Sequence, residues 1–562
     1  MEAIAAGHLE RLQTAVLKKY TAAMVSKWLT AHTTYGSEPY SYVDHEFQEN
    51  ILNDTSRETN TQKCSQIGIS EVSLRKALAL TNMIQNYKIG YTLPTAKFAG
   101  TFTKTRVDPV IEGSKTLKGA IHKTNDNNEV KQFGDSMLYF RGAASSNAPI
   151  SIPLDHLIHD EFDFSDQEVL GQYFSRLTHS KWKKIDRFST PTLPNFGINK
   201  FFRESRRHYM MAKCCHCNHW FIPDYYKHVK IPGFLKDLRE IDKSTLTRIK
   251  WGEAQVHCPS CGKVPSLQPE YREIVCENPD EGYVASGHQV SPFDAPNIIT
   301  AAFLVEASTK YDRIQDFINF NLGLPAEDSE ATLTREDFLQ VFLQVVASTS
   351  VTYVMGVDVG NIYHFVVAAI DAYGDMLVVH TEKLGMGHAK EKYRELRRRF
   401  QVVCTVIDSG PHAETVMSLQ DEDPNCFASV YMRSKSVVTH TVVNKKEEVE
   451  EGKDFVRQVN VNRNRAFDGY MAFIRENHLR IVDSDLKEEI IQHHTSMKRV
   501  KVFENESGEM AYSWQKSDGV DHFHHAFLYC WIAGKIRGVG GSLIILPTAR
   551  AFKFRLGKVT QR

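Results

Sequence analysis

The chain has 562 residues, of which 42% are hydrophobic and 24% charged, and its formal net charge is zero. This length predicts about two to four domains, and no apolar run approaches the ~18 residues that span a bilayer. The zero net charge disfavours a passive DNA-coating protein, and ten cysteines in so long a chain do not suggest a disulfide framework. The polar N-terminal segment MEAIAAGHLERLQ does not fit a signal peptide.

After an amphipathic N-terminal helix and a polar loop, the first motif with chemical meaning is KCSQIGIS, residues 63–70. The usual phosphate loop, GxxxxGK[ST], carries its lysine beside the final hydroxyl residue. Here Ile69 takes that place, and Lys63 stands at the front of the loop. Gly68 keeps the tight turn, and Ser70 can ligate magnesium at the start of a helix predicted for residues 71–87, whose N-terminus favours phosphate. The alternative is an ordinary loop capped by Ser70.

The stretch IPLDHLIHDEFDF, residues 152–164, predicts a buried strand that ends in Asp160 and Glu161. In a nucleotide-hydrolysing fold, the first acid of such a pair serves the metal ion and the second serves the attacking water. The alternative is that this Asp-Glu pair lies in an ordinary surface turn. Further strands predicted at residues 88–93 and up to Phe188-Ser-Thr-Pro191, with a helix at 98–110, favour an open, mostly parallel α/β sheet.

In this order, the segments KCSQIGIS, YTLPT, IHDEFD and FSTPT resemble the large terminase subunit of tailed bacteriophages. The likeness is greatest to the lambda-type branch, whose phosphate loop also has its lysine at the front. The resemblance implies an ASCE-type P-loop ATPase that packages viral DNA. It assigns the β/γ-phosphates to Lys63, the magnesium to Ser70 and Asp160, catalysis to Glu161, coupling of hydrolysis to movement to Ser189 and Thr190, and the adenine side to Gln48.

Two CxxC pairs predict a structural zinc site. They are Cys214–Cys217 and Cys258–Cys261, separated by a polar segment. Two thiolates at this spacing share one turn, and two such turns complete a tetrahedral set that leaves no position for water. Cys215, His216 and His257 could substitute as ligands, although their spacing is less regular.

Basic residues flank this segment and interleave with aromatic residues, a pattern typical of a surface that binds the phosphate backbone. A solvated amphipathic face is the equal alternative. The basic residues are Lys181, Lys183, Lys184, Arg187, Arg203, Arg206, Arg207 and Lys213.

Beyond residue 345, three strands, a charged helix at 389–400 and a strand ending in Asp408 predict a ribonuclease-H-like sheet. Asp358 lies in the first strand of this series, and Asp521 opens a late apolar helix. Three carboxylates at one sheet edge suit a nuclease that uses two Mg²⁺ or Mn²⁺ ions. The terminase resemblance matches GVDVG, VIDSG and DHFHHA to the acidic triad of that family, with His522 where relatives often have a further acid.

The sequence therefore predicts an N-terminal P-loop ATPase with a zinc-ribbon insertion and a C-terminal ribonuclease-H-like nuclease. The expected domains are a helical segment (1–45), the ATPase core (46–212), the zinc-knuckle insertion (213–290), the end of the ATPase and a linker (291–345), the nuclease (346–538) and a basic tail (539–562).

By the resemblance, the chain would use ATP with Mg²⁺ to move double-stranded DNA into a procapsid and would cut concatemers. Its partners would be the portal protein, the small terminase subunit and further copies of itself in a ring, in the host cytoplasm and outside any membrane. The alternatives are a helicase-nuclease, a transposase-type recombinase, or a zinc-containing scaffold whose nucleotide site is inactive.

Overall fold

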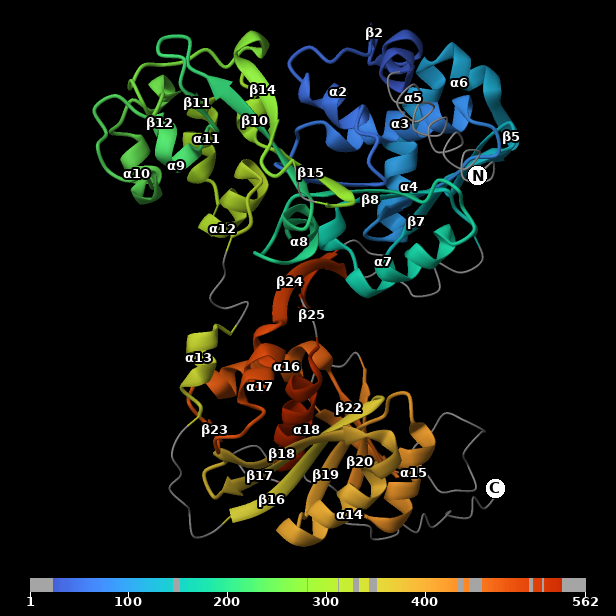
Figure 1. Ribbon diagram of the computed structural model, residues 1–562, viewed down its shortest axis with the longest axis vertical. Helices are drawn as coiled ribbons and strands as arrows, with labels where there is room; N and C mark the ends of the chain where they lie inside the picture. The colour runs from blue at the N-terminus through green and yellow to red at the C-terminus, as the bar shows by residue number, and fades with distance from the viewer. Residues whose placement is uncertain are drawn as a thin grey trace, which may run out of the picture. The chain divides into compact units, whose positions relative to one another are not determined.

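The computed structural model describes residues 24–144, 152–279, 282–311, 313–326, 333–342, 351–432, 438–443, 457–504, 509–517 and 520–537 (Figure 1). The chain divides into two compact units, residues 1–328 with 500–513 and residues 329–499 with 514–562. The predicted N-terminal helix before residue 24 and the basic tail 539–562 lie outside the described residues.

The first unit is built on a mixed sheet of eleven strands in the order β11-β10-β15-β3-β9-β8-β4-β7-β6-β5, with β14 paired to β10. Residues 24–32 are helical. The strands of the unit are β1 (Thr34–Tyr35), β2 (Glu38–Pro39), β3 (Glu58–Lys63), β4 (Lys88–Leu93), β5 (Ile121–Asp126), β6 (Val130–Phe133), β7 (Ser136–Gly142), β8 (His156–Asp160), β9 (Lys184–Ser189), β10 (Arg206–Lys213), β11 (Trp220–Phe221), β12 (Val229–Lys230), β13 (Gln255–Val256), β14 (Arg272–Cys276) and β15 (Ala285–Val290).

The helices of this unit are α2 (Phe47–Leu52), α3 (Ile69–Met83), α4 (Ala96–Phe102), α5 (Asp108–Gly113), α6 (Lys115–Ala120), α7 (Gln167–Tyr173), α8 (Gly197–Arg203), α9 (Tyr225–His228), α10 (Lys243–Leu246), α11 (Ala301–Ser308) and α12 (Ile314–Phe317). A π-helical turn, Thr103–Val107, joins α4 to α5, so the predicted helix at 98–110 is one helical stretch with an irregular middle. The predicted helix at 71–87 is α3, which begins two residues earlier, directly after the phosphate loop.

Parallel pairing runs without interruption from β10 through β15, β3, β9, β8 and β4 to β7. Strand β9 lies between β3, which leads into the phosphate loop, and β8, which ends in the two acids. Because the central strands are parallel, all of them deliver their carboxyl ends to the same edge of the sheet.

A buried cluster of charged side chains connects α3 to the sheet through Asp186 on β9. The carboxylate of Asp186, on β9, receives hydrogen bonds from Thr59 Oγ1 (2.6 Å) and Lys76 Nζ (2.7 Å), and His156 Nε2 lies 2.9 Å away. Burial raises the pKa of Asp186, but Lys76, Lys184 and His156 together hold it well below its usual range. The cluster therefore joins β3, β8, β9 and α3 through one ionised carboxylate.

The second unit has a sheet of eight strands in the order β21-β22-β20-β19-β16-β17-β18-β23. Its strands are β16 (Val351–Asp358), β17 (Ile362–Asp371), β18 (Met376–Gly385), β19 (Cys404–Asp408), β20 (Cys426–Tyr431), β21 (Val438–Val443), β22 (Arg457–Val461) and β23 (Leu479–Ile481), and its helices are α13 (Arg335–Leu339), α14 (Ala389–Phe400), α15 (Ala413–Glu422), α16 (Arg463–Arg475), α17 (Lys487–Thr495) and α18 (His522–Ile536). Two further strands, β24 (Met497–Glu504) and β25 (Glu509–Lys516), pair with each other.

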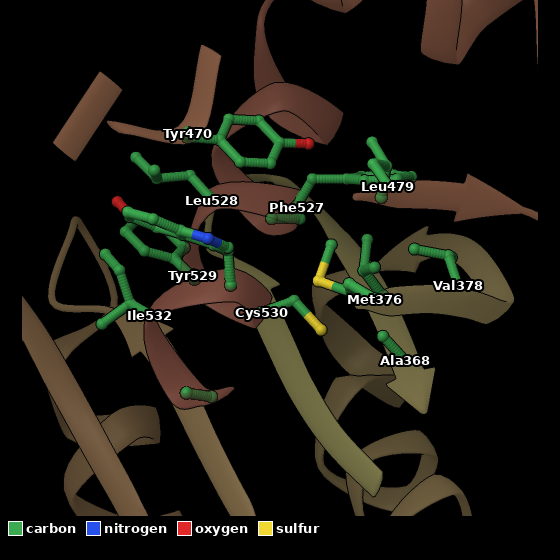
Figure 2. Close-up of a cluster of buried hydrophobic side chains, with 14 of the residues drawn as sticks. Ala368, Met376, Val378, Tyr470, Leu479, Phe527, Leu528, Tyr529, Cys530 and Ile532 are labelled. Carbon is green, nitrogen blue, oxygen red and sulfur yellow. The ribbon is translucent and has the colours of Figure 1, made fainter. Parts of the chain in front are cut away.

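The central five strands, β18-β17-β16-β19-β20, have the order and directions of a ribonuclease-H-like fold. β16 and β18 pair antiparallel with β17, and β19 joins β16 in parallel on its other side, as the sequence predicted. Helices α14 and α15 contribute Tyr393, Leu396 and Val416 to the core on one face. On the other face, α18 packs its Phe527 and Cys530 into a second core with Ala368 and Met376 from the sheet (Figure 2).

Helix α18 approaches strand β16 closely at Gly356, a position that follows from the alternation of side chains along the strand. Val354 faces α18 and Met355 faces α14, so Gly356 again faces α18. A Cβ at Gly356 would overlap the backbone of Ala526 and Cys530, which means that α18 lies on the strand where no side chain fits between them.

We predict that Gly356→Ala lowers the free energy of unfolding of the second unit by about 1–3 kcal/mol, because the added methyl group has to push α18 away from the sheet. Differential scanning calorimetry should record a fall of several degrees in its transition temperature, at roughly 2–4 °C per kcal/mol for a unit of this size. Gly387→Ala is the matched control, since no atom lies within 4 Å of a Cβ there. Equal transition temperatures for the two variants would contradict the proposed close packing.

Candidate functional site

The phosphate-loop motif forms the turn that its spacing predicts. Lys63 ends β3, and α3 begins at Ile69 immediately after Gly68, whose φ of +82° lies in the left-handed region. A Cβ at Gly68 would overlap the side-chain amide of Gln48, so the loop and α2 touch where the glycine leaves room. Gln48 Nε2 donates to the carbonyl oxygen of Ile67 at 3.4 Å, which places Gln48 directly against the loop.

The two acids lie opposite this loop, at the end of β8. Ser70 Oγ donates to Asp160 Oδ1 at 3.0 Å, and Tyr91 Oη donates to Asp160 Oδ2 at 2.9 Å. Lys63 Nζ lies 3.0 Å from Glu161 Oε1. The structure therefore brings the hydroxyl and the ammonium group of the loop to the two carboxylates, one to each.

Burial dominates the electrostatics of this group. It raises the pKa of Asp160 to about 7, with repulsion from Glu161 adding to the rise and attraction by Lys63 opposing it. Burial alone would lower the pKa of Lys63, but Glu161 and Asp160 outweigh it and hold that pKa above its ordinary value. A divalent cation beside Asp160 would favour the ionised carboxylate and lower its pKa.

The hydroxyl pair at the tip of β9 connects the loop to the acids. Ser189 Oγ lies 3.5 Å from Glu161 Oε2, and Thr190 Oγ1 lies 3.4 Å from Ser65 Oγ of the phosphate loop. Ser189 also accepts a hydrogen bond from the backbone N–H of Asp163, two residues after Glu161. Thr190 and Ser189 therefore connect the phosphate loop to Glu161 and to the segment that follows it.

These side chains surround a cavity of about 1080 Å³, large enough for a nucleotide. Six of the predicted residues line it: Gln48, Lys63, Gly68, Ser70, Asp160 and Glu161. Ser189 and Thr190 do not line it and reach the site only through their contacts with Glu161 and Ser65.

Two arginines that the sequence did not single out, Arg75 and Arg106, also line this cavity. Arg75 is buried and donates to the carbonyl oxygen of Thr34 at 2.6 Å, whereas Arg106 is half-exposed and lies 3.7 Å from Glu71. Arg106 comes from the π-helical turn after α4, and no local motif marks it. Tyr91 was also missed, although its place on β4 beside β8 follows from the strand order.

The cysteine pairs meet as their spacing predicts. The four Sγ atoms of Cys214, Cys217, Cys258 and Cys261 all lie within 4.8 Å of one another. Cys214 and Cys261 are 3.7 Å apart, as are Cys217 and Cys258, close to the ~3.8 Å that a tetrahedral zinc with bonds of about 2.3 Å requires. After each pair the chain turns through a left-handed residue, Asn218 or Gly262. The donor set therefore fits a structural zinc ion.

The other candidate ligands in this segment are occupied elsewhere or lie apart. His216 Nε2 is 3.0 Å from the carbonyl oxygen of Val264, and His257 Nδ1 is 2.8 Å from that of Gly262. Cys215 is exposed and does not belong to the cysteine group. The regular CxxC spacing thus selects the same four residues as the geometry does.

Not all of the basic residues that flank the zinc-binding segment are exposed to solvent. Arg187 is 9% exposed, and its Nη1 donates to Glu58 Oε2 at 2.8 Å and Asn60 Oδ1 at 3.0 Å. Lys184 belongs to the charge cluster around Asp186. The inclusion of Arg187 and Lys184 in a DNA-binding surface was therefore wrong, because both point into the sheet rather than into solvent.

In the second unit, strand register places the candidate acids on the face that α18 covers. Asp358 continues the alternation that puts Val354 and Gly356 toward α18, and Val357 pairs in parallel with Ile407, so Asp408 lies beside Asp358. Burial and the neighbouring Asp358 carboxylate raise the pKa of Asp408 to about 6. Tyr529 Oη, from α18, donates to Asp408 Oδ1 at 3.3 Å.

The third acid, Asp521, stands at the start of α18, but its carboxylate is engaged with His525 Nε2 at 3.3 Å. Burial raises the pKa of Asp521, and this hydrogen bond outweighs it and holds the pKa below its ordinary range. The neighbouring His522 faces Asp358 instead, with Nδ1 2.8 Å from Oδ2. A metal-binding role for all three acids stays a prediction.

Comparison with known protein families gives one match, which lies within the first unit. Residues 30–275 match the family model described as phage terminase large subunit gpA, ATPase domain. No curated protein sequence matches the chain.

Among solved structures, the chain is similar to the large terminase of bacteriophage HK97, with 10% identity over 92% of this chain and 99% of that one and a TM-score of 0.48. It aligns with the large terminase of a thermophilic bacteriophage at 11% identity over 86% and 94% of the two chains, with a TM-score of 0.28. The large terminase nuclease from thermophilic phage G20c aligns with 33% of this chain and 83% of its own length, at 12% identity and a TM-score of 0.22. All three TM-scores lie below 0.5, so the fold assignment rests on the strand orders and on the family match.

We predict about one tightly held zinc ion per chain, measured by atomic-emission spectrometry on dialysed protein. Cys217→Ser should lose this zinc and lower the unfolding temperature of the first unit, because three thiolates and a hydroxyl bind zinc far more weakly than four thiolates do. Cys215→Ser is the matched control and should keep its zinc. Equal zinc contents in the two variants would show that the four-cysteine assignment is wrong.

Proposed function

We propose that this chain is a viral DNA-packaging motor, because residues 30–275 match the family model of the phage terminase large subunit gpA, ATPase domain. In this proposal the first unit hydrolyses ATP to translocate double-stranded DNA into a procapsid, and the second unit cuts concatemeric DNA. The predicted terminase resemblance is confirmed at the level of family and fold, and the lambda-type branch stays a prediction. Among the described residues, no helix is both long and apolar enough to cross a membrane.

The observation that carries the ATPase proposal is the meeting of Lys63, Ser70, Asp160 and Glu161 around one cavity. Lys63 would hold the terminal phosphates, and Ser70 with Asp160 would hold magnesium, which neutralises phosphate charge when it is bound. Glu161 would orient a water molecule and accept its proton. Gln48, fixed between the loop and Tyr40 by a 2.6 Å hydrogen bond, would lie on the adenine side.

Ser189 and Thr190 would couple hydrolysis to movement. Their contacts with Glu161 and with Ser65 give the β9 tip one partner at the acids and one in the phosphate loop. The change that follows loss of the terminal phosphate can therefore pass along β9 toward α8 and the zinc-binding segment. Docking on the portal protein, binding of the small subunit and assembly into a ring belong to the same proposal, as do the domain boundaries given above.

The nuclease proposal is supported by the ribonuclease-H-like strand order and by Asp358 and Asp408 at adjacent strand ends. With Asp521 at the start of α18, these carboxylates would hold divalent metal ions, whose chemistry in such sites is the activation of water against a phosphodiester. The polypeptide's own part is to place the acids at one edge and, through Tyr529, to orient Asp408.

Glu161→Gln should lower DNA-stimulated ATP hydrolysis by about 10²-fold or more, since the amide keeps the size of the side chain but cannot accept the proton. Metal-dependent DNA cleavage should be retained. Phosphate release and plasmid nicking measure the two activities, and Glu168→Gln, an exposed change on α7, is the control. Unchanged ATP turnover would remove Glu161 from the catalytic role.

Asp358→Asn should give the reverse result, with cleavage reduced by about 10²-fold or more and DNA-stimulated ATP hydrolysis retained. The matched control is Asp485→Asn, an exposed aspartate of the same unit. Persistent nicking by the Asp358 variant would mean that cleavage takes place elsewhere. Loss of both activities with loss of the unfolding transition would mean that the substitution had only disturbed folding.

A further inference from the structure

We propose that the second unit binds a first-row transition-metal ion through Asp358, His364 and His522. This inference deepens the proposed nuclease function and rests on it for its catalytic consequence, although the binding of the metal can be tested by itself. In the sequence, Asp358 counted only as one of three acids, and no role was assigned to His364.

Strand register brings the three residues together. Asp358 is the direct cross-strand partner of His364 in the antiparallel pair of β16 and β17. On β17, Val366, Ala368 and Ile370 face α18, so His364 faces it as well. His522, the first residue of α18, completes the group from above the sheet.

The distances within the group are those of a ligand set. His522 Nδ1 lies 2.8 Å from Asp358 Oδ2, and one ligand atom from each of the three residues lies within 4.8 Å of the other two. Ligand atoms held at ~2.1 Å from a common ion are about 3–4 Å apart. In this structure His522 Nδ1 and Asp358 Oδ2 are at hydrogen-bond distance, so binding of an ion would replace this hydrogen bond with two bonds to the metal.

An unsatisfied polar atom provides the independent observation. His364 is only 2% exposed, and within the described residues its Nδ1 has no hydrogen-bond partner. Its ring stacks on that of His522 with centroids 4.8 Å apart and 17° between the planes. A buried ring nitrogen without a partner is costly, and coordination is one way in which a buried imidazole can offset that cost.

Most of the other charged and titratable groups nearby have partners of their own, although within the described residues His493 Nε2, like His364 Nδ1, has no hydrogen-bond partner. His493, on α17, receives a hydrogen bond from the N–H of Phe523 at 3.0 Å, and its Nε2 lies 3.8 Å from Glu489. Glu489 is itself paired with Lys383 at 2.5 Å. Asp521 is held by His525, and Asp408 receives the hydrogen bond of Tyr529. Asp358, His364 and His522 are the residues of this site whose ligand atoms all lie within 4.8 Å of one another, and the proposed roles of Asp408 and Asp521 at a divalent ion are unaffected.

Ligand chemistry determines the class of ion. Magnesium prefers oxygen ligands, whereas imidazole nitrogen suits zinc, copper, iron or nickel. A site with two imidazoles and one carboxylate should therefore select a transition metal over magnesium. If the second unit cuts DNA, this selectivity makes the cutting depend on the transition metal even where magnesium is abundant.

The test is pulsed electron paramagnetic resonance of the full-length, nucleotide-free protein loaded with Mn²⁺. We expect spin-echo modulation from directly bound ¹⁴N in the wild type, because zinc held by the cysteines is diamagnetic and a site of oxygen ligands gives no such signal. His364→Gln and His522→Gln should each lose the nitrogen modulation and weaken Mn²⁺ binding by about tenfold or more.

His478→Gln is the matched control, since His478 also pairs with an aspartate, Asp375, at 2.6 Å but is exposed and far along the sheet from the group. It should keep the nitrogen signal. If His364→Gln fails to fold, His522→Gln decides the question, because the His522 side chain is 40% exposed and tolerates change more easily.

Bound Mn²⁺ without nitrogen modulation in the wild type would overturn the inference, as would loss of the signal in His478→Gln. The two proposals fail in distinguishable ways. DNA cleavage without the nitrogen signal would leave the nuclease standing and remove the histidine site, whereas the nitrogen signal without any cleavage would do the opposite.

Discussion

Register between neighbouring strands is the constraint on which both sites depend. In the first unit, uninterrupted parallel pairing of β3, β9 and β8 brings Lys63, Ser189 and Asp160 to one edge, although long stretches of chain separate the three in sequence. In the second unit, one parallel and one antiparallel neighbour of β16 bring Asp408 and His364 to Asp358. A slip of one residue in any of these pairs would turn the side chain to the opposite face.

Much of this arrangement could be predicted from the sequence because it is encoded locally. The glycine and hydroxyl of the phosphate loop, the acids at the end of an apolar run and the two CxxC pairs are all short patterns whose chemistry follows from spacing. The order of the first four strands of the second unit was also predictable, since hairpin connections and a charged helix restrict the possible topologies. The extension from separate motifs to a family required the resemblance, and the matching family model covers residues 30–275.

The residues that could not be predicted are those placed by tertiary contacts alone. Arg106 reaches the cavity from a π-helical turn, and Arg187 leaves the basic surface because Glu58 and Asn60 draw it inward. His364 can be recognised as a candidate metal ligand only once its cross-strand partner is known to be Asp358. None of these three has a neighbour in sequence that signals its role, so no periodicity or spacing argument could have selected it.

The place of Gly68 has a consequence for the segment that precedes the ATPase sheet. Gln48 fills the space that a side chain at Gly68 would need, Tyr40 holds Gln48, and the guanidinium of Arg75, on α3, stacks 4.7 Å from the centre of the Tyr40 ring. These contacts form a closed circuit that runs from the loop out to residues 40–48 and back through α3. A side chain introduced at Gly68 would therefore have to displace Gln48 and, through it, Tyr40 and the guanidinium of Arg75.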